Sequence, residues 1–456
     1  MSTVSVPSSL CRYHIWTIGC QMNKADSDRL ESALIQLGLS PVESPKDADV
    51  IVLNSCVVRQ AAEDKVVGML TSLKPLKSKT PERVIALMGC MVGPKTDALQ
   101  SRFPYVDVFM RPQDYKPLLR LLGGRLGVDA EGCLGALTPP NASVTAFIPI
   151  IHGCDKFCTF CIIPYRRGRE VSRPLADIVH EAELLAARGV KEVTLLGQNG
   201  DSYGHDLPGA PDLADLLTAV HGVAGLQRVR FLTSHPNDMS QRIIGAVASL
   251  PKVCEHFNLP FQAGDDDVLQ VMRRGYTRDD YLRLVERIRE RVPGVSLSTD
   301  LIVGFPGETE AAFQRSLDLV REVEFDKVHV AAYSTRPGTI ASRQMEDDVP
   351  WAEKKRRLEE VEALQEQVLT RINARLLGQS VEVLVEELQT NKRLAASGSD
   401  VVLDLLNGGG SAKKWKGRNR NDKLVFFEDG RDLVGQTVRV RIEKTSPWSL
   451  QGVCVG

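Results

Sequence analysis

The sequence predicts an α/β protein in three parts: an N-terminal open parallel sheet (residues 1–128), a central partial (β/α)6 barrel of the TIM type with a trailing helix (138–377), and a small OB-like C-terminal β-barrel (379–456). Three observations predict this organisation. In the first part, short β-branched runs alternate with segments of helical length. Six more such runs follow within about 190 residues, which favours a barrel. The final part changes to short strands with alternating polar and apolar residues.

Length and charge exclude several classes of protein. The chain has 456 residues and a formal net charge of -1, from 57 Lys+Arg and 58 Asp+Glu, so it is not a uniformly basic nucleic-acid coat. Because 18 consecutive apolar residues occur nowhere, we expect no membrane contact. The N-terminal residues lack the charged and apolar regions of a signal peptide, which predicts a cytoplasmic protein.

In the N-terminal part, three cysteines follow predicted strands. The strands are expected at 13–19, 49–54 and 83–89, with helices at 26–37 and 57–73 between them. Cys20, Cys56 and Cys90 come one or two residues after these strands. Carboxyl ends of parallel strands form a ligand-binding crevice, so we expect the three thiols to meet there. The alternative is three unrelated small core residues.

The central part repeats the strand–helix pattern. A Gly-rich linker is expected at 121–143. Helices are predicted between the strands, for example at 174–188, with Pro174 in the first turn, and after the capping-box residues 277–280. A last helix at 350–377 presents Leu358, Val361, Leu364, Val368 and Ile372 on one face, and Gly378 can end it. The six strands are expected at 147–151, 192–196, 228–232, 255–259, 296–303 and 327–333.

The C-terminal part combines predicted strands with a basic segment. The strands are expected at 381–388, 401–406, 423–428 and 437–444. Basic side chains can contact phosphates while an aromatic ring stacks on a base, so the segment predicts an RNA-binding surface. The alternative is a solvated hairpin loop. The proposed RNA-binding residues are Lys413, Lys414, Trp415, Lys416, Arg418 and Arg420.

Three further cysteines lie close together after the first barrel strand. Cys154, Cys158 and Cys161 have the spacing CxxxCxxC and occupy the first βα loop, at the catalytic end of a barrel. Thiolates at this spacing can hold one side of a cubane iron–sulfur cluster and leave one iron open for a small molecule. Zinc is an alternative, but a zinc site normally has four protein ligands. His152 is a possible fourth ligand, although a loop histidine with an ordinary hydrogen-bond partner is the simpler interpretation.

This cysteine loop resembles that of the radical S-adenosylmethionine (SAM) superfamily. Other segments resemble the methylthiotransferase family in order along the chain: TIGCQMNKADSDR, VLNSCVVRQAAEDKVVG, MGCMVG, LLGQNGDSYG, RFLTSHPNDM, STDLIVGFPGETEAAF and YSTRPGT. The final segment is similar to the TRAM domain of that family. The resemblance implies two 4Fe-4S clusters, one on Cys154, Cys158 and Cys161 and an auxiliary one on Cys20, Cys56 and Cys90. These six cysteines are then the catalytic and metal-binding residues.

The implied reaction is transfer of a methylthio group at the expense of two SAM molecules. One SAM methylates a sulfur on the auxiliary cluster. The other SAM is cleaved at the radical cluster, and the resulting radical removes hydrogen from the substrate carbon. The resemblance also implies polar SAM contacts at the strand ends. The candidates are Gly197, Gln198, Asn199, Ser234, Gln262 and Asp300.

The substrate branch follows from two segments. The family modifies isopentenylated adenosine in tRNA, threonylcarbamoylated adenosine in tRNA, or a ribosomal-protein aspartate. Gly197-Gln198-Asn199 and TSHPND are most similar to the first branch, which acts next to the anticodon. Departures at Gly200-Asp201, Val92 and Ala263 concern only the choice of branch. The expected partners are the tRNA anticodon stem-loop and an electron donor such as flavodoxin or ferredoxin, and the chain is expected to be a monomer.

Other interpretations of the same residues remain open. A different radical enzyme would use the second cluster only for electron transfer. A non-enzymatic iron–sulfur sensor would bind RNA without consuming SAM. A second basic group follows the cysteine loop, and three alternative roles are expected for it: contact with RNA, binding of the SAM carboxylate, or support of the fold. Its members are Arg166, Arg167, Arg169 and Arg173.

Overall fold

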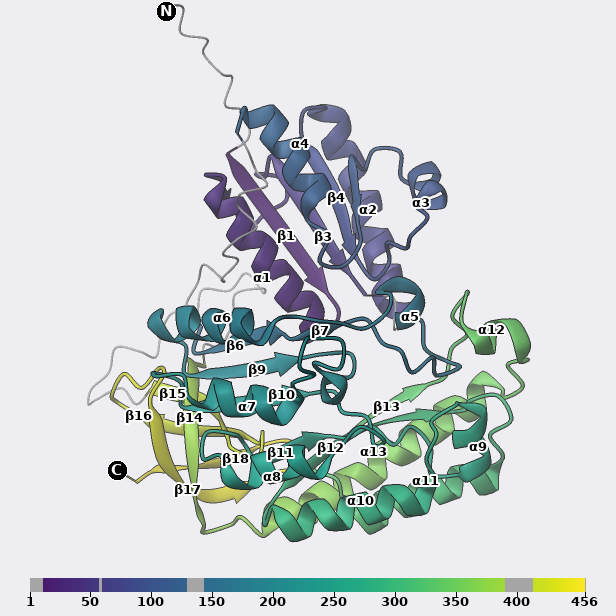
Figure 1. Cartoon of the computed structure of the whole chain (residues 1–456), viewed down its shortest axis with the longest axis vertical. Helices are drawn as coiled ribbons and strands as arrows, with labels where there is room; N and C mark the ends of the chain where they lie inside the picture. The colour runs from purple at the N-terminus through teal and green to yellow at the C-terminus, as the bar shows by residue number, and fades with distance from the viewer. Residues whose placement is uncertain (1–10, 57–59, 129–142, 390–412, 456) are drawn as a thin grey trace, which may run out of the picture.

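The structure of the chain is a computed structural model that describes residues 11–56, 60–128, 143–389 and 413–455. In Figure 1 the N-terminal sheet lies above the central domain, and the C-terminal strands lie beside the central domain at the lower left. The strand expected at 401–406 lies outside the described residues. The predicted fold class is confirmed, and the differences concern particular segments.

The N-terminal domain is a parallel five-stranded sheet in the order β2-β1-β3-β4-β5. The three predicted strands are confirmed, and β3 and β4 are buried along their whole length, as expected for the middle of a sheet covered on both faces. The strands are β1 (Arg12–Ile18), β2 (Ser40–Pro41), β3 (Val50–Ser55), β4 (Val84–Gly89) and β5 (Val108–Met110). The helices are α1 (Gln21–Gln36), α2 (Gln60–Lys79), α3 (Asp97–Arg102) and α4 (Lys116–Leu126).

Helix α4 corrects the predicted linker at 121–143. The helix continues through Gly123 and Gly124 and ends at Leu126, followed by Gly127 at a φ of 71°. Leu118, Leu119 and Leu122 are buried against the sheet. This apolar face stabilises the helix despite the low helix propensity of its glycines.

The central domain is a partial barrel of six parallel strands, as predicted. Two three-stranded sheets, β6-β9-β10 and β11-β12-β13, are connected by a bridge between Val229 and Val253. The strands are β6 (Thr145–Pro149), β9 (Glu192–Leu196), β10 (Arg228–Leu232), β11 (His256–Asn258), β12 (Ser296–Val303) and β13 (Lys327–Ala332). The helices are α6 (Leu175–Ala187), α7 (Leu213–His221), α8 (Gln241–Ser249), α9 (Asp266–Val271), α10 (Arg278–Arg291) and α11 (Glu310–Val323).

Short elements complete the loops at the carboxyl ends of these strands. They are β7 (Ile151–His152), α5 (Ile163–Arg166), β8 (Val171–Ser172), η2 (Gly200–Ser202) and α12 (Ile340–Gln344). The predicted capping box before α10 is present: Asp280 N–H donates to Thr277 Oγ1 at 3.2 Å, and Thr277 N–H donates to Asp280 Oδ2 at 3.0 Å.

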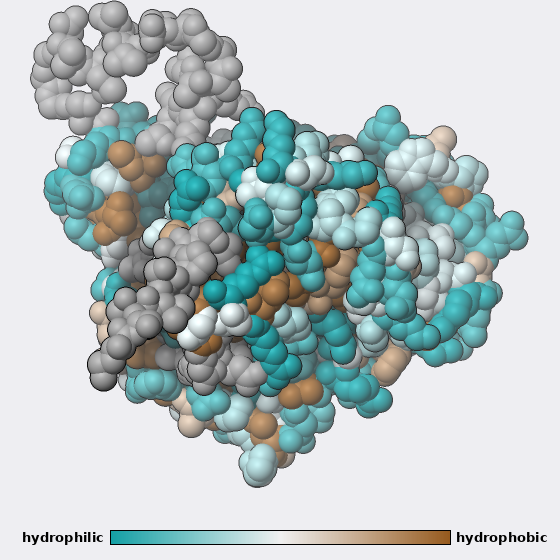
Figure 2. Space-filling model, turned by 90° about the horizontal axis from the view of Figure 1, so that it is seen from above, coloured by the Kyte–Doolittle hydropathy of each residue, from teal (hydrophilic) through white to brown (hydrophobic). Residues whose placement is uncertain are grey.

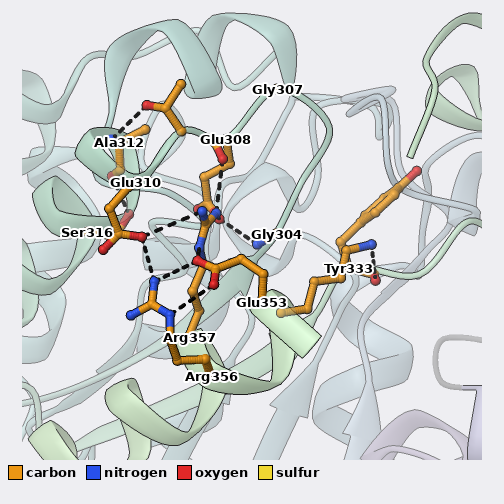
Figure 3. A network of polar contacts seen from close by, with 12 residues as sticks. Gly304, Gly307, Glu308, Glu310, Ala312, Ser316, Tyr333, Glu353, Arg356 and Arg357 are labelled. Atoms are coloured by element: carbon orange, nitrogen blue, oxygen red, sulfur yellow. Dashed lines mark hydrogen bonds and ion pairs between the residues drawn. The ribbon is translucent and has the colours of Figure 1, made fainter. Parts of the chain in front are cut away.

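The trailing helix α13 (Trp351–Ala374) packs its predicted apolar face against the barrel. It also supports the loop that follows β12. Arg357 donates to the buried Glu308 carboxylate at 2.7 Å, and Glu308 accepts the backbone N–H of Gly304 (Figure 3). Gly304 has a φ of 68°, and a Cβ there would lie 2.3 Å from Lys354 Cγ. The helix therefore fixes a loop at the catalytic end of the barrel.

The C-terminal domain is a closed barrel in the order β14-β15-β16-β18-β17. Trp415 and Phe427 are buried inside it with Val383 and Val440. The Trp415 Nε1–H donates to the Asp429 carbonyl at 3.2 Å. The strands are β14 (Ser380–Leu388), β15 (Lys413–Asn419), β16 (Leu424–Asp429), β17 (Thr437–Thr445) and β18 (Leu450–Cys454).

The C-terminal barrel docks on the amino ends of the central strands. Arg228, the first residue of β10, donates to the Arg418 carbonyl at 2.8 Å, and Arg230, in the middle of β10, donates to the carbonyls of Asn419 and Arg420, each at 2.8 Å. Arg420 in turn pairs with Glu255, directly before β11, at 2.7 Å, and Lys423 pairs with Asp326, directly before β13, at 2.6 Å. The turn between β15 and β16 is thus held at the end of the barrel opposite the cysteine loop (Figure 1).

No helix in the described ranges is long and apolar enough to cross a membrane. Figure 2 shows one face of the molecule, on which hydrophilic residues predominate and apolar residues appear between them.

Replacing Arg230 tests this docking. Arg230 and Glu192 are 5% and 6% exposed and lie 3.0 Å apart, so Arg230→Met leaves a buried carboxylate and two carbonyls without their main partner. We expect a loss of about 3 kcal/mol of stability. The measurements are a lower melting temperature and faster proteolytic release of the C-terminal barrel. Arg242→Met, at a 63% exposed side chain, is the control. Equal melting temperatures for the two variants would contradict the role of Arg230.

Candidate active site

Cys56 and Cys90 directly follow the carboxyl ends of β3 and β4, and Cys20 lies two residues after the end of β1. The strand pattern predicts these positions. The chain turns sharply before two of them. Gly19 has a φ of 151°, and a Cβ there would lie 2.8 Å from the Cβ of Cys56. Gly89 has a φ of 99°, and its Cβ would lie 2.3 Å from the Ser55 carbonyl oxygen. Glycine at both positions lets the three strand ends approach closely.

A buried amide network joins these three ends. The Asn23 side chain donates to Asn54 Oδ1 at 2.9 Å and to the Ser55 carbonyl at 3.0 Å. Asn23 Oδ1 lies 3.4 Å from both the N and the Sγ of Cys20. The Ser55 carbonyl also accepts the N–H of Cys90 at 2.9 Å. The network fixes Cys20 and Cys90 relative to the end of β3.

The loop with Cys154, Cys158 and Cys161 lies at the carboxyl ends of the barrel strands. Its backbone is fixed from both sides: Cys154 N–H donates to the Gly168 carbonyl and Thr159 N–H to the Met272 carbonyl, each at 3.1 Å. Arg274 donates to Cys158 Sγ at 3.3 Å from a buried position. Ile162, directly after Cys161, packs in the same apolar cluster as Cys90 of the N-terminal domain. The loop therefore contacts both domains.

Neither set of three thiols is arranged as a compact site for a single metal ion. Two sulfurs bound to one zinc at about 2.3 Å can be no more than about 4.6 Å apart. Among the described residues, only Asp155, Glu170 and His205 place three ligand atoms within 4.8 Å of one another, and neither cysteine set does so. This geometry disfavours the zinc alternative. Each set offers three thiols, which is the ligand number of a 4Fe-4S cluster with one iron open.

Burial favours the protonated form of the Cys90, Cys154 and Cys161 thiols. Burial is the main reason that the pKa of Cys154 is raised to about 11 and that of Cys161 to about 12. The neighbouring Cys158 contributes to both shifts, and a backbone hydrogen bond opposes each. Burial also raises the pKa of Cys90, against the charge and hydrogen bond of Arg167. Because a metal deprotonates a bound thiol, these sites need a cationic cluster to become thiolates.

Beside the cysteine loop, several buried polar atoms lack a partner among the described residues. They are Gln198 Oε1, Asn199 Oδ1 and His235 Nε2, all after the carboxyl ends of β9 and β10. The pKa of His235 is lowered to about 2 by burial and then by the charges of Arg274 and Lys156, so the imidazole is neutral. Buried polar atoms normally have partners, and a polar cofactor such as SAM can supply them.

A lysine of the cysteine loop is linked to the same strand ends. Lys156 pairs with Asp238 at 2.7 Å, and Asp238 accepts the Asn199 amide at 2.6 Å. The loop and the Gln198-Asn199 segment are thereby held at a fixed spacing.

The other predicted SAM residues lie at the same end of the barrel, with different surroundings. A Cβ at Gly197 would lie 2.7 Å from Ile151 Cγ2, so the glycine allows close packing. The Ser234 hydroxyl donates to Asp201 at 3.0 Å and is buried. Gln262 has a φ of 67°, and its N–H donates to the Asp300 carbonyl at 2.9 Å. Their contacts with SAM remain predictions.

The proposed RNA-binding segment needs correction. Trp415 is only 2% exposed inside the barrel, so the prediction that its ring stacks on a base is wrong. Arg420 is occupied by Glu255 and Arg418 by Glu386 and Asp422, and Lys416 pairs with Glu387 at 2.6 Å. Lys413 and Lys414 are exposed, with their ammonium groups over the rings of Trp415 and Phe426. These two lysines remain suited to bind phosphates.

The second basic group divides between the surface and the domain boundary. Arg169 is 73% exposed and pairs with Asp155. Arg173 supports the fold through Glu181 at 2.6 Å. Arg167 is buried between the domains, where it contacts Asp26 and Cys90. These three arginines therefore have different surroundings, and their contacts with RNA or SAM stay predictions.

Comparison with protein families divides the chain in the same way. Residues 148–320 match the radical SAM superfamily, residues 12–111 match a family described as uncharacterized protein family UPF0004, and residues 405–455 match the TRAM domain.

Full-length relatives decide the family. A tRNA-2-methylthio-N(6)-dimethylallyladenosine synthase from Roseiflexus sp. (strain RS-1) is 49% identical over 447 residues, which cover 97% of this chain and 89% of the relative. One from Dehalococcoides mccartyi (strain CBDB1) is 48% identical, with 97% and 98% covered. The chain belongs to the tRNA-2-methylthio-N(6)-dimethylallyladenosine synthase family. It is a radical SAM methylthiotransferase, and the predicted family is confirmed.

A solved structure shows the same fold at low identity. The radical S-adenosylmethionine methyltransferase TsrM from Kitasatospora setae, with cobalamin and a 4Fe-4S cluster bound, superimposes with a TM-score of 0.55 at 16% identity. The match covers 73% of this chain and 77% of TsrM. This similarity supports the fold class alone.

Sequence reasoning missed three side chains of this synthase-family site: Asp26, His235 and Arg274. Their signals were present, since Asp26 lies in the segment TIGCQMNKADSDR, His235 in RFLTSHPNDM and Arg274 before GYT. Each of these residues contacts a residue more than 30 positions away in the sequence. Arg274 contacts Cys158, Asp26 contacts Arg167, and His235 contacts Asp201. Local spacing does not reveal such pairs.

Asp201 provides a test by pH. It accepts hydrogen bonds from Ser234 Oγ and His235 N–H, and burial raises its pKa from 3.8 to about 8. Because the pKa is higher in the folded than in the unfolded chain, ionisation removes stability as pH rises from about 4 to about 8. Asp201→Asn keeps the shape and cannot ionise. We expect the melting temperature of the variant, relative to wild type, to rise across this interval and level off above pH 8.

The comparison uses thermal unfolding of both proteins at pH 5, 6.5 and 8.5. The predicted slope is about 1.4 kcal/mol per pH unit within the interval. A melting-temperature difference that does not change with pH would show that Asp201 ionises normally.

Proposed function

We propose that this chain transfers a methylthio group to C2 of the N(6)-isopentenylated (dimethylallyl) adenosine next to the anticodon of tRNA. The observation that carries the proposal is identity of about half the residues to synthases of this name over 97% of the chain. Two sets of three cysteines at facing strand ends support it, because sulfur insertion by a radical needs one group to form the radical and another to supply sulfur.

The residues present fit two 4Fe-4S clusters and SAM. Cys154, Cys158 and Cys161 would hold the radical cluster, and Cys20, Cys56 and Cys90 the auxiliary one. When bound, these groups supply the radical, the sulfur and the methyl group. Arg274 donates to Cys158 Sγ and so stabilises its negative charge. The unpartnered Gln198 and Asn199 oxygens accept hydrogen bonds from a polar cofactor and orient it.

The TRAM match and the names of the relatives support tRNA as the partner. We propose that the anticodon stem-loop is the part bound, with the exposed Lys413 and Lys414 as phosphate contacts. A flavodoxin or ferredoxin as electron donor, a monomeric state and a cytoplasmic location stay predictions.

Substrate choice tests the proposed function. A pocket shaped for the apolar prenyl group loses that burial with unmodified adenosine, so we expect turnover to fall by a factor on the order of 100. The measurement is nucleoside mass spectrometry of tRNA after anaerobic reaction with SAM and a reductant. Equal rates with and without the prenyl group would exclude this substrate, and faster turnover of threonylcarbamoylated tRNA would favour the sister branch.

Cysteine variants provide matched controls for the same reaction. Replacing Cys154, Cys158 and Cys161 with Ala should abolish SAM cleavage and leave about half of the iron, since one of two equal clusters remains. Replacing Cys20, Cys56 and Cys90 with Ala should keep SAM cleavage and abolish methylthiolation. Full methylthiolation by the second variant would refute the sulfur-donor role of those cysteines.

The RNA contact is tested through salt dependence. Replacing Lys413 and Lys414 together with Gln should reduce the salt slope of tRNA binding by about 2, because each phosphate contact contributes about 1. The control removes equal charge elsewhere, from the exposed Arg242 and Lys355. Binding would be measured by filter retention from 50 to 200 mM salt, and identical slopes for both double variants would exclude the lysines from the interface.

A further inference from the structure

One arginine crosses from the barrel to the N-terminal domain. Arg167 lies six residues after Cys161, yet its side chain ends among residues of the other domain. It donates through one terminal nitrogen to Asp26 Oδ2 at 3.1 Å and through Nε to Cys90 Sγ at 3.3 Å. The Arg167 and Asp26 side chains are 2% and 0% exposed. The contact is therefore enclosed by both domains.

The next residue contacts the other cysteine set. The Gly168 carbonyl accepts the N–H of Cys154 at 3.1 Å. This approach depends on Gly153, since a Cβ at that position would lie 1.9 Å from the Arg169 carbonyl oxygen. Two consecutive residues thus contact one ligand from each set: Arg167 contacts Cys90, and Gly168 contacts Cys154.

The neighbouring contacts fix this segment against the N-terminal domain. Arg111 donates to the Arg166 carbonyl at 3.3 Å, and a Cβ at Gly93 would lie 2.3 Å from a terminal nitrogen of Arg166. Arg29 of α1 lies 3.7 Å from Glu181 of the barrel, which also pairs with Arg173. The domain boundary around Arg167 is closely packed and charged on both sides.

Stability alone does not explain a buried pair of this kind. The free-energy cost of removing two charges from water offsets most of their mutual attraction unless every polar atom of the pair has a hydrogen-bond partner. Here one terminal nitrogen of Arg167 and Asp26 Oδ1 are buried without a partner among the described residues. An apolar pair of similar volume would pack the boundary at least as well. The charged pair therefore points to a role in positioning or in electrostatics.

We propose that Arg167 is a positioning residue that holds the Cys90 cluster at a fixed spacing from the cysteine loop and stabilises it by an N–H···S bond. The inference rests on the proposed function for the assignment of Cys20, Cys56 and Cys90 to a cluster. Hydrogen bonds and positive charge near cluster sulfurs favour the reduced, more negative cluster. Loss of Arg167 then shifts the potential of that cluster to more negative values and loosens the spacing of the two sites.

The first experiment isolates the auxiliary cluster. In a parent protein with Cys154, Cys158 and Cys161 replaced by Ala, the midpoint potential is measured by a redox titration followed by electron paramagnetic resonance. Arg167→Gln should shift the potential to a more negative value than in the parent. Arg167→Lys, which keeps the charge but not the paired geometry, should give an intermediate shift. Arg242→Gln, at an exposed site, should give none.

An unchanged potential and spectrum in Arg167→Gln would overturn the proposal. If that variant does not fold, Arg167→Lys decides on its own, because it keeps a positive charge in the same space: a potential equal to that of the parent then overturns the proposal. Neither measurement of the midpoint potential depends on formation of the methylthio product. Failure of the proposed function would instead appear as absence of that product with the wild-type protein.

The second experiment uses the protein with both clusters. Arg167→Gln should keep reductant-driven SAM cleavage near wild type and lower methylthiolated product by about 10-fold, the usual loss when a residue that supports a metal ligand is removed. Parallel loss of SAM cleavage and product would place the effect of Arg167 on the radical cluster and refute the inference.

Discussion

A parallel sheet places the loops that follow its strands along one edge, and this molecule packs two such edges against each other. Met22 and Ala25 of α1 pack with Leu196 at the carboxyl end of β9. Ile162, after the cysteine loop, packs in the N-terminal domain. Cys56, Cys90 and Cys158 are buried, Cys154 and Cys161 are half-buried, and Cys20 is exposed. The two sets come together only because the domains share this boundary.

The boundary is specific because its central contacts are polar and directional. Apolar surfaces alone tolerate sliding, whereas a buried guanidinium bonded to a carboxylate and a thiol has one favourable geometry. The glycines before the cysteines act in the same sense, since Gly19, Gly89 and Gly153 each leave no room for a side chain. Close backbone approach and the Arg167 contacts together link the two cysteine sets across the domain boundary.

Much of this could be predicted from the sequence because it depends on local patterns. The strand ends at Cys20, Cys56 and Cys90 could be predicted from short runs of β-branched residues. The six barrel strands could be predicted because such runs alternate repeatedly with segments of helical length. Trp415 shows the limit of composition. In β15 the burial alternates, with Trp415, Gly417 and Asn419 inside, and this alternation in KKWKGRN was the better guide than its basic charge. Arg420 was not predictable, because its role depends on how two separate domains dock.

The position of the C-terminal barrel constrains the substrate. Its β15–β16 turn is held at the amino ends of the central strands, while the cysteine loop lies at their carboxyl ends. In the proposed function, a substrate that contacts Lys413 and Lys414 as well as the cysteine loop spans two domains, which an RNA stem can do and a free nucleoside cannot. Phosphate contacts far from the reacting base then supply binding free energy without crowding the cluster sites.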